Sequence, residues 1–457
     1  FYSAFMVSDK VTIDTLSYKK DAKPVHWECD GGSEFDMEDG DWDQVGTKIT
    51  LYLNEDCLEF CNEYKAKEVI KKYCSFMPTE IYVSKAEETE VQIIKPEEKL
   101  DSDEVVEEFE DEVKTPAKDG EPEKTEKVKK LRIRKRPELM NDTHPLWTKH
   151  PNECTKEEYI DFYRKVFMDY KEPLFWIHLN MDYPFNLKGI LYFPKINMEY
   201  ESIEGTIKLY NNQVFIADNI KEVIPEFLML LKGVIDCPDL PLNVSRSALQ
   251  NDGFVKKISD YITKKVADRL QEIFNNERKQ FEEKWDDIKL FIEYGMLSDE
   301  KFYDRAQKFA LLKDTDKKYY TLEEYKTLIE ANQTDKDKNL IYIYATDAVA
   351  QYSYIEIAKS KGYDVLLMDG QLDIHFIGLL EQKLEKSRFV RVDSDIIDNL
   401  VRKNDKTEVS LDAAQRNMMT TVFKSQIPTL EKAEFMVMFE ALGEQSQPVI
   451  ITQNEFM

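Results

Sequence analysis

One stretch of this chain cannot contribute to a hydrophobic core, and it therefore divides the sequence in two. Residues 95–126 consist mainly of Glu, Asp and Lys, and they include Pro96, Pro116 and Pro122. A segment of this composition buries too little apolar surface to offset the conformational entropy that ordering would remove. We therefore predict a disordered or loosely ordered charged linker at residues 85–139, with folded regions on both sides.

A short basic run, LRIRKR, occupies residues 131–136 near the end of this region. Such a run could contact nucleic acid. The chain carries a net charge of −26, however, and that favours contact between the basic run and the acidic linker instead.

Length and charge limit the class of protein. A chain of 457 residues exceeds a single core and predicts about three domains. The net charge disfavours nucleic acids and anionic membranes as general partners and favours basic or partly unfolded polypeptides. No apolar run reaches the roughly 20 residues of a membrane helix, and we recognise no signal peptide. The six cysteines lack C-x-x-C spacing, which favours reduced thiols in a cytoplasmic protein without a metal site.

Apolar periodicity predicts an α/β chain in which strands and helices alternate. Expected strands cover residues 4–7, 48–53, 174–179, 189–193, 206–210, 214–216, 340–344, 363–367 and 448–452. Expected helices cover residues 59–76, 155–167 (opened by a Thr155–Glu158 capping box), 220–235, 254–296 and 351–360, with a short one after residue 408. The strand–helix–strand order of residues 340–367 predicts a right-handed parallel crossover.

The most informative motif is DLPLNVSR at residues 239–246, followed by Gln250. A proline-stiffened loop delivers the Arg246 side chain to a fixed place. A guanidinium group offers five N–H donors in a planar fork, which matches a terminal phosphate. Electrostatic clamping of this kind is most of what phosphoryl transfer requires. A surface salt bridge is the alternative interpretation of an isolated arginine.

At this point a family resemblance becomes clear. The chain resembles the heat-shock protein 90 family of molecular chaperones, and most closely its bacterial HtpG branch. Besides the motif loop, the matching blocks are FYSAF at 1–5, WE at 27–28, GGS at 31–33, GTKI at 46–49, LWT at 146–148, IKLY at 207–210, VFI at 214–216, IPE at 224–226 and LIY at 340–342. Their order along the chain matches the family as well.

The resemblance implies an overall α/β architecture in four parts. Residues 1–84 would be an α+β remnant of an ATP-binding domain of the kind shared with DNA gyrase, MutL and histidine kinases. The charged linker at 85–139 would follow. Residues 140–403 would form a complete α/β/α middle domain that carries the arginine loop and contacts clients, and residues 404–457 a partial α+β dimerisation domain.

The resemblance also assigns site residues one at a time. Phe1, Gly46 and Thr47 resemble parts of the nucleotide pocket, and Arg246 resembles the middle-domain arginine that reaches the γ-phosphate. Asn243 and Gln250 resemble its partners in the same loop. The general-base Glu, the Mg²⁺-holding Asn and the adenine-reading Asp would lie before Phe1. We therefore expect ATP and Mg²⁺ to act in the full-length parent, and no cofactor to bind this fragment, which alone should be inactive.

Several aromatic residues are candidates for contact with client proteins. Tyr170 falls where the family often has an aromatic residue that touches clients. Trp147, Phe175 and Trp176 could form an exposed patch, although core packing is the alternative for all three. Phe456 and Met457 resemble the approach to an amphipathic client-binding segment.

The resulting functional prediction is an ATP-dependent chaperone that remodels unfolded or partly folded clients through a clamp cycle, as a homodimer. Two alternatives stay open. One is a DNA-associated ATPase of the same superfamily, such as a MutL-like protein, but those proteins use lysine where this chain has Arg246, and they favour DNA. The other is a non-enzymatic acidic interaction scaffold, on which nucleotide would have no effect.

Overall fold

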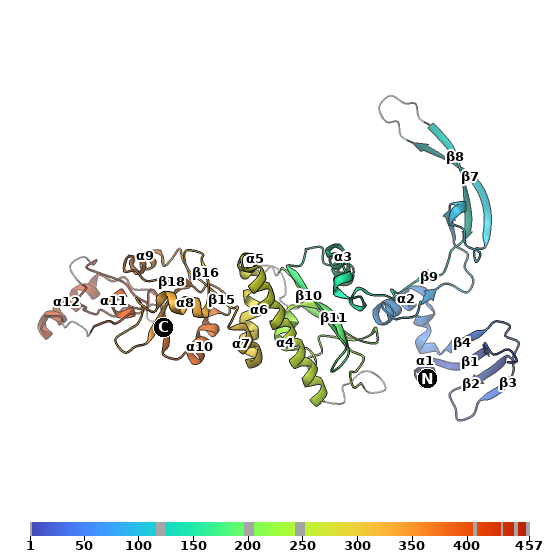
Figure 1. Cartoon of the computed structure of the whole chain (residues 1–457), viewed down its shortest axis with the longest axis horizontal. Helices are drawn as coiled ribbons and strands as arrows, with labels where there is room; N and C mark the ends of the chain where they lie inside the picture. The colour runs from blue at the N-terminus through green and yellow to red at the C-terminus, as the bar shows by residue number, and fades with distance from the viewer. Residues whose placement is uncertain are drawn as a thin grey trace.

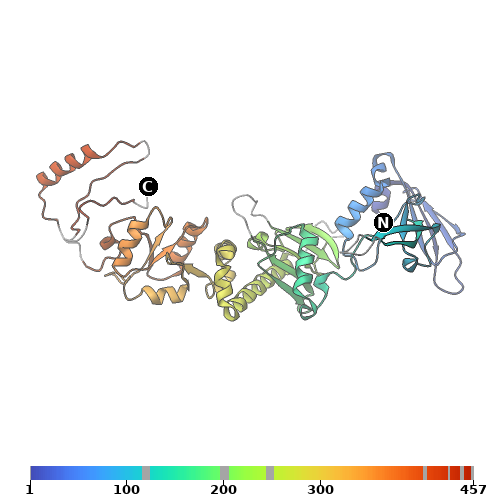
Figure 2. The same ribbon diagram turned by 90° about the horizontal axis from the view of Figure 1, so that it is seen from above.

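The computed structural model describes residues 2–115, 124–195, 205–242, 252–404, 409–430, 433–442 and 447–453. The molecule is elongated, with the N-terminal sheet at one end and a long hairpin that projects from the body (Figure 1). Figure 2 shows helix α12 at the opposite end from the N-terminal sheet. Mixed helices and strands in several sheets confirm the predicted α/β class. The proposed domain boundaries remain predictions.

The N-terminal unit is an antiparallel sheet followed by a helix. Strands β1 (Ser8–Leu16), β2 (Val25–Cys29), β3 (Asp36–Asp39) and β4 (Gly46–Leu53) lie in the order β3-β2-β1-β4. Helix α2 (Glu63–Cys74) follows the 3-10 helix η1 (Glu55–Cys61), and its N-cap is Asn62, whose side chain accepts from the Tyr64 amide. The predicted strand at 48–53 and the helix within 59–76 are confirmed.

The strand expected at residues 4–7 is wrong, because these residues belong to helix α1 (Tyr2–Val7). The Ser8 hydroxyl donates to the Ala4 carbonyl oxygen one helical turn earlier. A four-residue apolar run is too short for its periodicity to separate helix from strand.

The region predicted as a disordered or loosely ordered linker instead contains a three-stranded sheet. Its strands β6 (Val91–Ile94), β7 (Val105–Thr115) and β8 (Lys124–Arg134) lie in the order β6-β8-β7, and the short η2 (Pro96–Glu98) follows β6. Cross-strand charge pairs join the two long strands: Arg132 Nη1 lies 2.6 Å from Glu107 Oε2, and Lys130 Nζ lies 2.6 Å from Asp111 Oδ2. Opposite charges across a strand pair stabilise it. The predicted contact between the basic run and acidic residues is thus confirmed.

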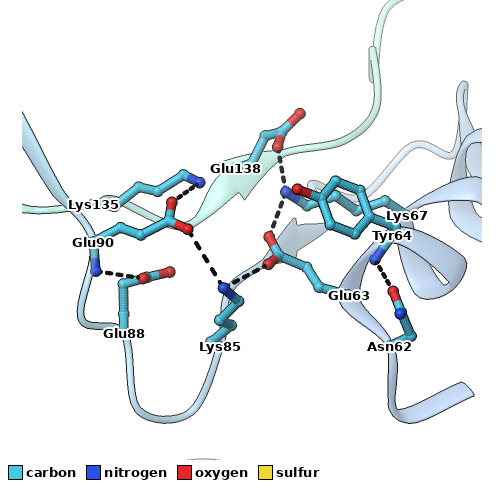
Figure 3. A network of polar contacts seen from close by, with 9 residues as sticks. All are labelled: Asn62, Glu63, Tyr64, Lys67, Lys85, Glu88, Glu90, Lys135 and Glu138. Carbon is cyan, nitrogen blue, oxygen red and sulfur yellow. Dashed lines mark hydrogen bonds and ion pairs between the residues drawn. The ribbon is translucent and has the colours of Figure 1, made fainter.

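The two ends of this charged region leave the body side by side. Strands β5 (Tyr82–Val83) and β9 (Glu138–Leu139) pair antiparallel directly below it. In Figure 3, Lys67 of α2 bridges Glu63 and Glu138, with Nζ–O distances of 2.6 Å to each carboxylate. Further pairs join Lys85 to Glu63 and Glu90, and Lys135 to Glu90. Because the chain leaves and returns at the same place, the charged hairpin does not lengthen the connection between the N-terminal unit and the middle unit.

The middle unit is built on a five-stranded sheet. Strands β10 (Phe175–Met181), β11 (Leu187–Phe193), β12 (Thr206–Asn211), β13 (Val214–Asp218) and β14 (Lys232–Asp236) lie in the order β10-β11-β14-β12-β13. Only the β12–β14 pair is parallel. On one face lie η3 (Leu146–Thr148), η4 (Pro151–Glu153) and α3 (Lys156–Phe167), whose predicted Thr155–Glu158 capping box is confirmed.

The helix predicted at residues 220–235 is wrong. These residues form the short 3-10 helix η5 (Glu226–Leu230) and then β14, the central strand of the sheet. A strand buried on both faces is apolar at every position, so it lacks the alternation that marks a half-exposed strand. At Gly233 an added Cβ would lie 2.8 Å from the Ile190 carbonyl oxygen, which is the close approach of β11 that this glycine permits.

The other face of the sheet is covered by helices α4 (Asp252–Asn276), α5 (Arg278–Glu283), α6 (Trp285–Ser298) and α7 (Glu300–Ala306). The predicted helical region 254–296 is confirmed, although it is interrupted between α4, α5 and α6. Apolar side chains of these helices and of the sheet form the main core, of which the largest fully buried members include Trp285, Phe281 and Phe302.

A second, smaller α/β unit continues the chain. Its elements are β15 (Leu311–Lys313), β16 (Tyr319–Thr321), α8 (Leu322–Ile329), β17 (Leu340–Ala345), α9 (Tyr352–Ser360), β18 (Val365–Leu367), α10 (Asp373–Lys383), β19 (Ser387–Arg391) and α11 (Ile397–Leu400). Strands β18, β17 and β19 are parallel, so the predicted parallel crossover is confirmed.

The C-terminal part contains helix α12 (Ala413–Gln426), which confirms the short helix expected there. The strand expected at 448–452 is wrong: these residues have no regular structure, although the Gln453 amide donates to the Asp393 carbonyl oxygen. In the described ranges, no helix is both long enough and apolar enough to cross a lipid bilayer.

Candidate functional site

The arginine loop rises from the carboxyl end of the central strand β14. Its first residues are anchored: the Cys237 amide donates to the Tyr210 carbonyl oxygen, and the Asn186 amide donates to Asp239 Oδ2 at 2.7 Å. Leu240 packs into the main core. The predicted residues Asn243, Arg246 and Gln250 lie outside the described residues, and α4 begins at Asp252. Their roles remain predictions. Residues 237–242, which lead to them and are called the stem of the arginine loop below, are fixed by these hydrogen bonds and by the packing of Leu240.

A second anchor of this stem comes from the neighbouring strand. The Asn211 side chain at the end of β12 donates from Nδ2 to the carbonyl oxygens of Cys237 and Pro238, at 3.1 and 3.0 Å. Because β12 and β14 are parallel, their carboxyl ends meet at one edge of the sheet, which brings Asn211 to the stem. Sequence reasoning missed Asn211. Its place between two predicted strands indicated only a connection.

A buried carboxylate lies immediately before the stem. Asp236 Oδ2 accepts from the Trp147 indole N–H at 3.2 Å and from the Gln213 amide at 3.0 Å, whereas Oδ1 has no hydrogen-bond partner among the described residues. Burial raises the pKa of Asp236 above its ordinary value. No sequence pattern distinguished Asp236, because its partners come from distant segments.

The end of α2 packs into the middle unit beside this carboxylate. Phe76 is buried against Trp147 and Tyr210, with ring centroids 4.8 and 5.7 Å away, and Tyr73 lies 6.0 Å from Phe215. These rings belong to the aromatic core on the α3 face of the sheet. The N-terminal unit and the arginine-loop stem are therefore connected through continuous packing.

Gly46 and Thr47, the described nucleotide-pocket candidates, lie at the start of β4 in the N-terminal sheet, which forms one end of the molecule in Figure 1, with α2 between it and the middle sheet. The Thr47 hydroxyl lies 2.8 Å from the Thr15 hydroxyl, across the β1–β4 pair. Gly46 has φ +139° and open space where a Cβ would stand, so a ligand could approach its backbone closely. Phe1 lies outside the described residues. Among the residues that the structure describes, no group of three or more His, Cys, Asp or Glu side chains is placed to hold a metal ion.

The structure separates the client-contact candidates. Trp147 is fully buried, so the prediction that it belongs to an exposed patch is wrong. It is a core residue whose indole N–H donates to Asp236. Phe175 and Trp176 are half-buried and stack on Phe193 and Tyr159. Tyr170 is 77% exposed. Phe456 and Met457 lie outside the described residues. Tyr170 is therefore the candidate best placed to meet a client.

His178 of β10 is a half-buried titratable group next to this aromatic core. Its Nδ1 lies 2.6 Å from the Tyr159 hydroxyl, and burial lowers the pKa of His178 to about 4. Unfolding restores an ordinary pKa near 6.5. As the pH falls from 6.5 to 4, the unfolded chain therefore binds a proton that the folded chain does not, and stability is lost.

We predict that His178→Gln loses less stability than the wild type between pH 7 and pH 4.5, because glutamine does not titrate. Urea unfolding at several pH values measures the difference. Asn180→Ala, at an exposed and non-titrating position of the same strand, is the control and should follow the wild-type pH profile. Parallel profiles for wild type and His178→Gln would show that His178 does not titrate in this window.

Comparison with known proteins places this arrangement in a family. The family model described as "Hsp90 protein" matches residues 59–457. The chaperone protein HtpG of Bacteroides fragilis is 53% identical over the whole chain, which covers 62% of that protein. HtpG of Bacteroides thetaiotaomicron is 52% identical and HtpG of Porphyromonas gingivalis 48% identical, again over the whole chain, with 62% and 61% of those proteins covered. This chain thus spans about three fifths of the length of these curated relatives, and it belongs to the Hsp90 protein family.

Proposed function

We propose that the full-length protein is an ATP-dependent molecular chaperone, an ATPase that binds unfolded or partly folded clients in the cytoplasm and remodels them as a homodimer. The observation that carries the proposal is the anchored stem of the arginine loop, in a chain that belongs to the Hsp90 family. Family membership favours this function over a DNA-associated ATPase or an acidic scaffold.

The chemistry follows from the loop. ATP, when bound with Mg²⁺ by the full-length protein, supplies a phosphoanhydride bond whose hydrolysis can drive domain motion. In this chain, Gly46 and Thr47 are the residues that would line the pocket, and both are exposed at the start of β4. Arg246 would donate from its guanidinium to the terminal phosphate, and Asn243 and Gln250 would orient it. A pocket completed by a second domain couples turnover to clamp closure.

The client surface would include Tyr170. Tyr170 follows Met168 by two residues in the chain, and Met168 is also exposed and caps the C-terminus of α3 in a left-handed conformation. Large exposed apolar groups mark contact sites, and methionine adapts its shape to varied partners. An unfolded polypeptide with exposed apolar side chains fits such a surface.

Replacing Arg246 by alanine in the full-length protein is expected to lower kcat for ATP hydrolysis by about 100-fold or more, because a donor to the transition-state charge is lost. The KM for ATP should change little. Steady-state ATPase assays measure both, and refolding of a chemically denatured test protein with and without ATP reports the chaperone activity.

Ser247→Ala is the matched control, since it changes the adjacent residue and leaves the guanidinium in place. It should retain wild-type turnover. Wild-type turnover by Arg246→Ala would reject the proposed role of the arginine. Failure of ATP to affect refolding by the wild-type protein would reject the ATP-driven chaperone.

A further inference from the structure

The hairpin between β12 and β13 closes through a two-residue connection whose second residue is a glutamine. Asn212 and Gln213 both have left-handed backbones, with φ of 50° and 62°. Asn211 and Val214 pair directly on either side of them. Tight hairpin turns of this kind favour Asn-Gly, because a side chain at positive φ is strained by about 1 kcal/mol or more. A glutamine at the second position therefore needs a reason.

The side chain of Gln213 supplies one. Its Nε2 donates to the Phe76 carbonyl oxygen at 2.6 Å and to the Thr143 carbonyl oxygen at 3.2 Å. Phe76 follows α2 and is buried among aromatic rings of the middle unit, so its carbonyl group is held in place. The Gln213 side-chain amide thus joins the β12–β13 turn to two places: the residue that follows α2, and Thr143 in the segment that leads into the middle unit.

The same turn also contacts the residues that lead into the arginine loop. The Gln213 backbone amide donates to Asp236, the last residue of β14, and the neighbouring Asn211 holds the carbonyl groups of Cys237 and Pro238. Gln213 therefore contacts the end of α2 and Asp236, and Asn211, two residues earlier, contacts the first residues of the loop stem.

We infer that Gln213 is a positioning residue for the ATPase reaction: it couples the end of α2 to the stem of the loop that carries Arg246. The inference rests on the proposed function. Movement of the N-terminal unit would pull on the Phe76 carbonyl, and the stiff two-residue turn would transmit the displacement to the stem. Gln213 acts through Asn211 and Asp236, and no contact between Gln213 and nucleotide is required.

The test uses the full-length protein and two matched glycine variants. Gln213→Gly relieves a positive φ and deletes the amide that reaches α2. Asn219→Gly also relieves a positive φ and deletes a side-chain amide, at the other end of the hairpin. Asn219 has φ 50°, and its side chain accepts from the Ile207 amide and donates to the Gly205 carbonyl oxygen, both next to its own sheet. Gln213→Glu keeps the length of the side chain but removes its N–H donors.

Expected results separate positioning from simple stability. Gln213→Gly and Gln213→Glu should lower kcat by roughly 3- to 30-fold, the usual range for a residue in a coupling network, with the KM for ATP nearly unchanged. Asn219→Gly should keep kcat within about twofold of the wild type. Exchange of the backbone amide hydrogens of Cys237, Asp239, Leu240 and Leu242 should accelerate in Gln213→Gly and stay at the wild-type rate in Asn219→Gly.

Each contrary outcome has a distinct meaning. If both Gln213 variants show wild-type kcat and wild-type exchange while Arg246→Ala is impaired, the inference is wrong and the proposed function stands. If Asn219→Gly is impaired to the same extent as Gln213→Gly, hairpin stability explains the effect and the positioning role is rejected. If the wild-type protein hydrolyses no ATP, the proposed function itself fails, whereas the exchange measurement still tests the coupling.

Discussion

Replacing Trp147 by alanine is expected to lower the free energy of unfolding by about 3–5 kcal/mol, which is the range for a large buried aromatic side chain. Trp147 is fully buried, and its ring lies 4.8 Å from Phe76, 5.8 Å from Phe162 and 5.1 Å from Tyr210 between centroids. The truncation opens a cavity at the point where α2 meets the middle sheet. It also removes the indole N–H from Asp236, so a buried carboxylate loses one of its donors.

Two substitutions separate these contributions. Trp147→Phe keeps a buried ring but removes the donor to Asp236 and part of the ring volume, so it should cost about 1–3 kcal/mol, less than the full truncation. Trp176→Ala removes a half-buried ring that stacks on Tyr159 at 4.8 Å, and it should cost less than Trp147→Ala. Urea unfolding followed by circular dichroism measures all three. A loss below about 1 kcal/mol for Trp147→Ala would show that Trp147 packing does not stabilise the contact between α2 and the middle sheet.

Loss of Lys289 should be comparably severe, at about 3–5 kcal/mol for Lys289→Met, because it leaves a buried carboxylate without its cation. Lys289 Nζ on α6 lies 2.6 Å from Asp373 Oδ2 on α10, and Asp373 is fully buried. Apart from Lys289, the Gly370 amide donates to the same oxygen of Asp373. The pair joins the helical layer of the middle unit to the smaller α/β unit, so its loss should loosen that junction.

A third group in this cluster, Glu293, has a pKa above that of an ordinary surface glutamate. Burial raises the pKa of Glu293 to about 9, and Glu293 lies 3.8 Å from Lys289. The folded protein thus keeps a proton that the unfolded chain releases near pH 4.5. The contribution of Glu293 to stability therefore falls as the pH rises from about 4.5 to about 9.

Glu293→Gln is accordingly the matched control for Lys289→Met, since both alter the same cluster. It should be at least as stable as the wild type at pH 7 and should flatten the decline of stability between pH 5 and pH 9. Unfolding curves at several pH values distinguish the two variants. A large loss of stability for Glu293→Gln at pH 7 would show that Glu293 is charged in the folded protein. No loss for Lys289→Met would show that Asp373 does not depend on the Lys289 cation.

Much of the fold follows from signals that are local in the chain. The Thr155–Glu158 capping box begins α3 where predicted, because a cap depends on residues three positions apart. The apolar residues of α4 recur every three or four positions and predicted a long helix. The parallel arrangement of β17 and β18 followed from the order of strand, helix and strand.

Errors occurred where the deciding contacts are distant. The central strand β14 was predicted as a helix, since it is apolar at successive positions and its strand character depends on pairing with β11 and β12. The charged region was predicted to lack order because its composition offers little core. Its order comes from pairing an acidic strand with a basic one, and composition alone does not report pairing.

The site divides in the same way. A linear motif and the order of short blocks are enough to identify the family and to select Arg246, Gly46 and Thr47, because these features are written in consecutive residues. The partners of the arginine loop are different: Trp147 meets Asp236 across 89 positions, and Gln213 meets the Phe76 carbonyl across 137. Those contacts exist only after the chain has folded back on itself, so no local pattern encodes them and the three-dimensional arrangement alone reveals them.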